Sequence, residues 1–402
     1  MRFDCRNDAD SFPGRKEGGL GGTAPARSWH IPSPMKTNVR YAVIGLGHIT
    51  QAAVLPAFAH ARRSSTLTAL ISSDPAKLRK LGRKYGVERL YSYEQFDECM
   101  ESGVVDALYI ALPNHLHAEY TVRAAKHGVH VLCEKPMAVT EKDCQTMIDA
   151  CEKHDVRLMI AYRLHFEKAN LATLKLLESG KIGEPRLFNS VFTMDVRQGD
   201  IRLRQETGGG TLYDIGIYCI NAARSLFRDE PVEVVGMSAR RDDARFAEVE
   251  EMFSATLRFP GDRIANLICS FGTSDCAEYR VVGTKGNVRL DPAYEYAAEL
   301  KQYVTTGGQP RQRIFAKRDQ FAPELAYFAD CIQRGVEPEP SGREGLADVR
   351  VIEALYRSAS KNKPIALRPL EGVRHPSESQ EISRPPVKRE PKLVKTKPPS
   401  KD

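Results

Sequence analysis

Between residues 39 and 162, short apolar runs alternate with longer amphipathic segments, and this alternation constrains the fold more than any other feature. The apolar runs lie at 39–45, 66–72, 104–112, 129–133 and 156–162. Because they are short and mostly apolar, they predict strands buried on both faces, as in a parallel sheet. Asp74-Pro75 is typical of a helix start and Gly128 of a helix end. The pattern predicts an α/β domain with a doubly wound parallel sheet over 38–163.

After residue 164, strands are expected in direct succession. They lie at 186–193, 232–239, 251–259, 263–271 and 277–282. Successive strands without intervening helices favour antiparallel pairing. Helices are expected at 324–334 and at 343–360, the second with an apolar face. The sequence therefore predicts an α+β domain with a mostly antiparallel open sheet over 164–368.

Both ends of the chain differ in composition from the middle. Residues 1–37 are rich in Gly, Pro, Ser and charge, which predicts a flexible extension; the alternative is an arm, anchored by Trp29, on the cofactor or a neighbouring subunit. Residues 369–402 are rich in Pro and Lys and predict a disordered basic tail. Residues 384–402 hold seven Lys or Arg against two acidic residues, +5 of the chain's +7. Nucleic acid is therefore not an expected partner of the folded part, and the tail is the remaining candidate for such binding.

The distribution of cysteine and of apolar residues indicates the compartment. The nine cysteines contain no Cys-x-x-Cys pair, so neither a disulfide framework nor a zinc site is expected. His115 and His117 lack a third ligand at useful spacing, so no metal is expected there either. No run of eighteen apolar residues and no apolar signal core is present. The sequence predicts no membrane association and a cytoplasmic location.

A glycine turn joins the first predicted strand to the first helix. Gly-x-Gly at this place lets the backbone turn tightly and approach a pyrophosphate, which the following helix N-terminus binds through its amides. Thr50 stands where the fingerprint has Gly or Ala. The alternative is an ordinary strand-to-helix turn. We expect a Rossmann dinucleotide site that includes Gly45, Leu46, Gly47, His48 and Ile49.

The end of the second predicted strand distinguishes NADP from NAD. NAD sites place an acidic residue there for the ribose hydroxyls, whereas this chain has Ser72-Ser73. Serine accepts a 2′-phosphate without repulsion, and Lys77 can pair with its charge. NADP is therefore predicted, with Ser72 and Lys77 in its site. Asp74 is expected to cap the next helix; if it turns onto the ribose instead, NAD is favoured.

Three residues with acid–base chemistry follow these elements. Lys135 ends the fourth predicted strand, where doubly wound sheets bind ligands, and its ammonium can polarise a hydroxyl or carbonyl. Asp214 and Tyr218 are four residues apart and share one face if the segment is helical. Together they form a proton-transfer set for oxidising an alcohol. The alternatives are a surface lysine, a helix-terminal aspartate and a core tyrosine.

In combination these motifs resemble the Gfo/Idh/MocA oxidoreductases, and most of all their glucose–fructose oxidoreductase branch. The resemblance covers about 38–368 and is carried by Gly45-Leu46-Gly47, Leu112 through His117, Glu134-Lys135-Pro136-Met137, and Gly208 through Tyr218. It implies a Rossmann domain, an α+β domain whose open sheet supports a homodimer or homotetramer, and a cis Lys135–Pro136 bond.

The resemblance also implies roles for individual residues. The catalytic residues would be Lys135, Asp214 and Tyr218, with Tyr218 taking the hydroxyl proton. The same three would bind substrate together with Arg204. Phe166 through Ala169 and Asp195 through Ile201 depart from the family pattern, which leaves the sugar unidentified. The implied cofactor contacts beyond the glycine turn, Ser72 and Lys77 are Leu112, Pro113, Asn114, His117, Glu134, Lys135 and Arg163.

The sequence thus predicts an NADP-dependent oxidoreductase that transfers hydride between nicotinamide and a sugar or polyol. One alternative is an NAD-dependent inositol or trans-dihydrodiol dehydrogenase of the same family. Another is a non-catalytic nucleotide-binding redox regulator, which would bind cofactor without turning over any sugar.

Overall fold

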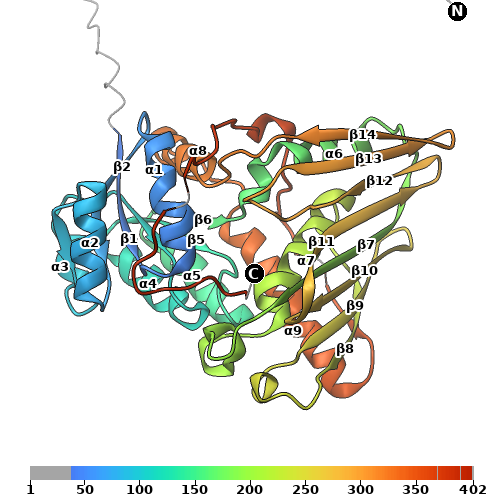
Figure 1. Ribbon diagram of the computed structural model, residues 1–402, viewed down its shortest axis with the longest axis horizontal. Coiled ribbons are helices and arrows are strands. Elements are labelled where there is room, and N and C mark those ends of the chain that lie inside the picture. The colour runs from blue at the N-terminus through green and yellow to red at the C-terminus, as the bar shows by residue number, and fades with distance from the viewer. Residues whose placement is uncertain (1–37, 369, 390, 401–402) are drawn as a thin grey trace, which may run out of the picture. The chain divides into compact units, whose positions relative to one another are not determined.

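The computed structural model describes residues 38–368, 370–389 and 391–400. The predictions for residues 1–37, including the arm anchored by Trp29, lie outside the described residues. The described chain contains two sheets with helices packed between and around them (Figure 1). No helix in this part of the chain is long and apolar enough to cross a membrane.

The first sheet is parallel throughout and confirms the predicted doubly wound fold. Its spatial order, β3-β2-β1-β4-β5-β6, is that of a Rossmann domain. The predicted strands form because their side chains are almost wholly buried between helices. The sequence pattern missed β3, because it is three residues long and partly exposed. The six strands are Val39–Ile44 (β1), Ser65–Ile71 (β2), Arg89–Tyr91 (β3), Ala107–Ile110 (β4), His130–Glu134 (β5) and Leu158–Ala161 (β6).

Local sequence signals set the helices of this domain. The Asp74 carboxylate caps α2 by accepting from the backbone amides of Ala76 and Lys77, at 2.8 and 3.1 Å. Gly86 ends the same helix with a φ of 68°, which the left-handed region allows glycine to adopt. The helices are Leu55–Ala61 (α1), Pro75–Tyr85 (α2), Phe96–Glu101 (α3), His117–Lys126 (α4) and Glu141–Lys153 (α5).

The second sheet has nine strands in the order β14-β13-β12-β11-β7-β10-β9-β8-β15. Its pairs are antiparallel except for β7 with β10, which confirms a mostly antiparallel sheet. β14 was not predicted because six of its seven residues are exposed, so no apolar alternation marks it. The strands are Pro185–Asp195 (β7), Glu233–Ala239 (β8), Met252–Phe259 (β9), Arg263–Ser270 (β10), Gly272–Gly283 (β11), Gly286–Leu290 (β12), Leu300–Thr306 (β13), Gln309–Phe315 (β14) and Ile365–Ala366 (β15).

Four helices in the described chain after residue 167 lie between or beside the two sheets. These are Lys168–Glu178 (α6), Ile217–Phe227 (α7), Ala322–Arg334 (α8) and Gly342–Lys361 (α9), and α7 and α9 lie on the inner side of the second sheet (Figure 1). Helix α8 packs back on the parallel sheet, where the Leu325 carbonyl accepts from the hydroxyls of Tyr41 and Ser65, each at 3.1 Å. The C-terminal helices therefore also cover the Rossmann sheet.

A buried charge network fixes α7 to α9. The Arg224 side chain is fully buried, and its guanidinium lies 2.8 Å from Glu230 and 3.0 Å from Glu344. A third carboxylate, that of Asp348, lies 2.5 Å from it. Such a cluster is stable only while every charge keeps its partner.

The C-terminal segment differs from the prediction of a disordered tail. Residues 370–389 and 391–400 run as an extended segment along the folded part and end between the two sheets (Figure 1). Gln380 is buried and donates to the Glu339 carbonyl at 2.9 Å, and Lys175 pairs with Glu378 at 2.6 Å. The Pro and Lys content concealed that this segment also carries apolar side chains and backbone groups with partners in the fold.

Candidate active site

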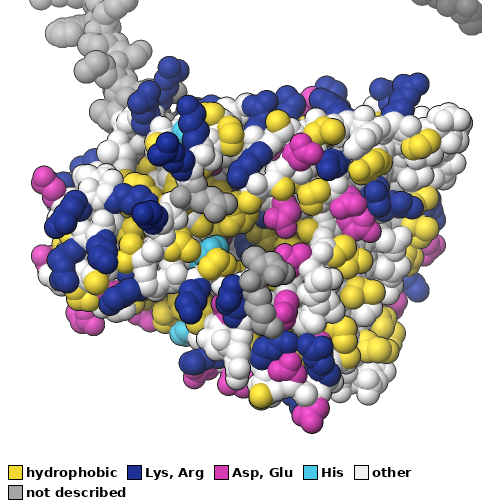
Figure 2. Space-filling view, in the orientation of Figure 1, with side chains coloured by type: hydrophobic (Ala, Val, Ile, Leu, Met, Phe, Trp, Pro, Cys, Tyr) yellow, Lys and Arg dark blue, Asp and Glu magenta, His cyan; other side chains and the backbone are white. Residues whose placement is uncertain are grey.

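A cavity of about 880 Å³ opens at the carboxyl ends of β1, β4 and β5, and the surface is hollowed between the two halves in Figure 2. Its size suits a dinucleotide with a small substrate. Residues from both sheets line it. The predicted cofactor residues all lie on its wall: Gly45, Leu46, Gly47, His48, Ile49, Ser72, Lys77, Leu112, Pro113, Asn114, His117, Glu134, Lys135 and Arg163.

The glycine turn fits a pyrophosphate for two separate reasons. Gly45 has a φ of +89°, and a Cβ there would lie 2.4 Å from the Ala111 carbonyl oxygen. A Cβ on Gly47 would have no atom within 4 Å, so its absence keeps open the space that a phosphate would enter. Thr50 donates to the Gly45 carbonyl at 2.6 Å, which ties the turn to its helix. The departure at Thr50 is therefore compatible with the turn.

The adenosine end of the cavity fits a 2′-phosphate better than a ribose diol. Ser72 lines it, and its hydroxyl accepts from the Asp74 amide at 3.2 Å. The Asp74 carboxylate is occupied by the cap of α2. Lys77, on the first turn of that helix, also lines the cavity. The predicted alternative, in which Asp74 turns onto the ribose, is not the arrangement seen.

Lys135, Asp214 and Tyr218 come together in one corner of the cavity. The Lys135–Pro136 bond is cis, as the resemblance implies. The Lys135 ammonium donates to the Asp214 carbonyl at 2.6 Å and lies 3.5 Å from the Asp214 carboxylate. It also lies 4.5 Å from the centre of the Tyr218 ring. A cation, a carboxylate and a phenol thus face the same space, and Lys135 is only 12% exposed.

A second cation, to which the sequence assigned no role, holds the Asp214 carboxylate. Arg202 donates from Nε to Asp214 at 2.7 Å and also pairs with Asp200 at 3.1 Å. Burial alone would raise the pKa of Asp214, but Arg202 and Lys135 outweigh burial and lower it. Arg204, predicted to bind substrate, is more than half exposed, pairs with Glu206, and does not line the cavity.

Arg163 and Glu134 complete this corner. The Arg163 guanidinium lies 5.0 Å from the Tyr218 ring centre and donates to the Gln320 side chain and to the Tyr294 carbonyl. The Glu134 carboxylate accepts from the Tyr109 hydroxyl at 2.8 Å. Burial raises the pKa of Glu134. The partner Tyr109 carries no sequence signal beyond its place in a buried strand.

His117 holds backbone rather than metal. Its ring is fully buried, with Nδ1 2.9 Å from the Pro136 carbonyl and Nε2 2.9 Å from the Leu112 carbonyl. It therefore fixes the end of β4 against the peptide that carries Lys135. Asn114 donates to the Gly208 carbonyl at 2.8 Å and joins the two halves of the site. Within the described residues, no three His, Cys, Asp or Glu side chains are grouped to hold a metal ion.

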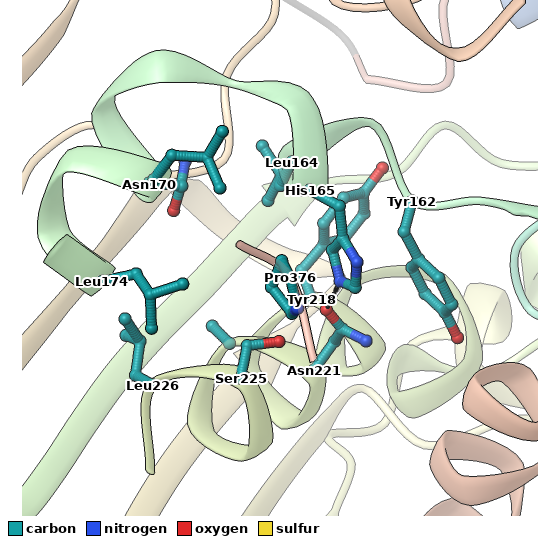
Figure 3. A pocket seen from close by; sticks show the side chains of 12 residues that line it. Tyr162, Leu164, His165, Asn170, Leu174, Tyr218, Asn221, Ser225, Leu226 and Pro376 are labelled. Carbon is teal, nitrogen blue, oxygen red and sulfur yellow. Dashed lines mark hydrogen bonds between the residues drawn. The ribbon is translucent and has the colours of Figure 1, made fainter. Parts of the chain in front are cut away.

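A small cavity of about 40 Å³ lies behind Tyr218 (Figure 3). There His165 and Asn221 point toward each other, with Nε2 and Oδ1 2.7 Å apart, and Pro376 of the C-terminal segment lies beside them (Figure 3). Burial opposes a charge on His165, but the Glu339 carboxylate at 2.9 Å outweighs burial and raises the pKa of His165 to about 9. A fixed polar network therefore supports the helix that carries Tyr218.

Comparison with known proteins agrees with this geometry. The family model described as "Oxidoreductase family, NAD-binding Rossmann fold" matches residues 39–162, and the GFO/IDH/MocA C-terminal domain matches 171–289. A D-xylose 1-dehydrogenase [NADP(+)] of Haloarcula marismortui is 33% identical over 356 residues, covering 87% of this chain and 98% of the relative.

Two solved structures are also similar. The aldose-aldose oxidoreductase of Caulobacter crescentus, complexed with glycerol, is 40% identical with a TM-score of 0.79, covering 82% of this chain and 100% of that one. A 3-ketoreductase of Actinomadura kijaniata, in complex with NADP, is 26% identical with a TM-score of 0.73, covering 80% and 98%. This chain therefore belongs to the Gfo/Idh/MocA oxidoreductase family.

Proposed function

We propose that the protein is an NADP-dependent oxidoreductase that transfers hydride between the nicotinamide and a hydroxyl or carbonyl of a sugar or polyol. The observation that carries this proposal is the position of the Lys135 ammonium between Asp214 and Tyr218, in the cavity that begins at the glycine turn. The xylose dehydrogenase and aldose-aldose oxidoreductase among its relatives favour an aldose as substrate.

The chain's own residues would manage the proton and the substrate. NADP, when bound, supplies a hydride acceptor. Tyr218 would accept the proton of the substrate hydroxyl, or return it to a carbonyl oxygen in the reverse direction. Asp214, ionised by its two cations, would accept hydrogen bonds from neighbouring hydroxyl groups and orient the sugar.

The cations around Tyr218 would stabilise the negative charge that develops on oxygen during proton transfer. Lys135 and Arg163 lie 4.5 and 5.0 Å from the ring centre. Charges that are already fixed before the reaction contribute most, because no reorganisation is needed at the transition state. A non-catalytic redox regulator would not need Lys135 and Arg163 placed around Tyr218 in this way.

The direct test is the nucleotide that the purified protein carries. Mass spectrometry of the released nucleotide is expected to identify NADP, and absorbance at 340 nm is expected to rise with aldoses and to fall again with carbonyl substrates. Binding without any absorbance change across a panel of sugars and polyols would instead support the regulator. NAD as the bound species, with turnover of inositol or a dihydrodiol, would support the dehydrogenase alternative.

Replacing Lys77 by alanine is expected to weaken NADPH binding about tenfold and leave NADH binding within a factor of two. The loss of one charge-assisted contact to a 2′-phosphate has about this size. Fluorescence titration of wild type and Lys77→Ala with both nucleotides measures it. Lys80→Ala, one turn later and exposed, is the matched control. Equal losses for both nucleotides would contradict a 2′-phosphate site at Lys77.

We further propose that two copies associate through the outer face of the second sheet. Register places Met237 of β8 and Ile268 of β10 in one cross-strand row, and Met237 is 73% exposed. The two large apolar side chains flank Ser254 of β9 and are both exposed, which favours this face as a contact surface. Light scattering is expected to give a dimer or tetramer, and the double variant Met237→Lys, Ile268→Lys a smaller assembly. A monomeric wild type would contradict the proposal.

We also propose a cytoplasmic location, which the eight described cysteines support because all of them are free. Fractionation of the source cells would test it, and recovery outside the cytoplasm would contradict it.

A further inference from the structure

The last part of the C-terminal segment, residues 385–389 and 391–400, supplies part of the wall of the large cavity. Its residues Val387, Pro391, Leu393, Pro398, Pro399 and Ser400 line the same space as the glycine turn and Lys135. The matched family domains end at residue 289. This part of the cavity wall therefore comes from residues that lie beyond the matched family domains.

One side chain joins the segment to the glycine turn. Gln51 is 1% exposed, and its Oε1 accepts from the Val394 amide at 2.7 Å. Its Nε2 donates to the Val394 carbonyl at 3.1 Å and to the Leu46 carbonyl at 2.9 Å. Because Leu46 is the middle residue of the turn, the segment is fixed directly beside the expected pyrophosphate.

The segment is also held at both ends of the cavity. At one end the Arg384 side chain donates to the His60 carbonyl at 3.1 Å. At the other, Arg197 donates from its amide to Pro399 at 2.9 Å and from Nε to Ser400 at 2.6 Å. These contacts attach the segment to the fold on both sides of the cavity.

A third contact changes the charge at the adenosine end. The Lys395 ammonium lies 3.2 Å from the Asp74 carboxylate, which lines the cavity next to Ser72 and Lys77. An unpaired carboxylate there would repel a 2′-phosphate. Lys395 offsets that charge by pairing with the Asp74 carboxylate. Figure 2 shows Lys and Arg side chains gathered over the part of the surface that carries α1 and α2.

We propose that the C-terminal segment is a functional wall of the NADP site, which slows release of the dinucleotide and, through Lys395, favours the 2′-phosphate. This inference rests on the proposed function. The segment therefore affects two separate quantities, the dissociation rate of any dinucleotide and the preference for NADPH over NADH.

The first experiment compares the full chain with a chain that ends at Arg384. NADPH fluorescence after mixing with excess unlabelled nucleotide gives the dissociation rate, and circular dichroism checks the fold. Truncation is expected to accelerate release of NADPH and of NADH at least about tenfold, because the part of the cavity wall that the segment supplies is gone. Equal rates in two folded proteins would overturn the inference. If neither protein bound either nucleotide, the proposed function itself would fail.

The second experiment keeps the segment and changes one charge. Lys395→Gln is expected to weaken NADPH binding about fivefold and to leave NADH affinity unchanged. The effect is modest because the Lys395 side chain is 62% exposed, and exposed ion pairs contribute little. Lys392→Gln, an exposed lysine three residues earlier, is the matched control and is expected to bind both nucleotides normally. An unchanged NADPH affinity in Lys395→Gln, or an equal loss in the control, would overturn the role of Lys395.

Discussion

Replacing Lys135 by methionine is expected to lower kcat by about 10²- to 10⁴-fold while the protein still binds NADP. Methionine keeps much of the volume of lysine, so the fold should hold, but the ammonium between Asp214 and Tyr218 is lost. A positioned acid–base group contributes a factor of this size to a proton-transfer step. Steady-state turnover with an aldose, together with nucleotide titration, separates loss of chemistry from loss of binding.

Two further variants sharpen this prediction. Tyr218→Phe removes the phenol oxygen alone, and a comparable loss of kcat is expected. The double variant, which carries both Lys135→Met and Tyr218→Phe, is expected to lose less than the product of the two single effects, because both residues act on one proton transfer. Lys142→Met makes the same change at an exposed lysine of α5 and should leave turnover near normal. Near-normal rates in Lys135→Met would remove it from the catalytic set.

The elements of the fold could be predicted where side-chain burial leaves a clear apolar pattern in the sequence. Strand β4 is buried on both faces and apolar throughout, and β1 is apolar except for the half-buried Arg40. Strand β14 is exposed at the sheet edge, where backbone pairing rather than side-chain burial forms the strand, so the sequence pattern does not show it. The C-terminal segment was missed for a related reason, since its contacts are mostly hydrogen bonds to single side chains such as Gln51.

The positions of the candidate site residues follow from the sequence more easily on regular elements than on irregular ones. Lys135 follows a buried strand, so its direction could be inferred. Asp214 lies in a π-helical stretch, Leu212–Gly216, before α7, and no sequence rule predicts that widened turn. The contact of Arg202 with Asp214 was not predicted, because Arg202 lies in an irregular three-residue helical turn, Ile201–Leu203.

Replacing Arg224 by methionine is expected to destabilise the protein by about 3–5 kcal/mol, the largest stability loss predicted for a single substitution here. The cause is not the lost attraction alone, because Glu230, Glu344 and Asp348 would remain buried without their cation. Urea unfolding measures the change at constant m value. Arg334→Met, which breaks the exposed pair with Asp330, is the control and should cost no more than about 0.5 kcal/mol.

The pH dependence of the stability loss in Arg224→Met distinguishes unpaired buried charge from a loss of packing. Burial raises the pKa of Glu344 from its ordinary value of 4.5 to about 7 in the folded state. Between these two pH values the folded state binds more protons than the unfolded state, so the protein loses stability as pH rises through them. Without Arg224, the pKa of Glu344 rises further, because the cation that lowers it is gone. The Arg224→Met deficit should therefore be smaller at pH 5.5 than at pH 8. A deficit independent of pH would mean that cavity formation, and not unpaired charge, destabilises the variant.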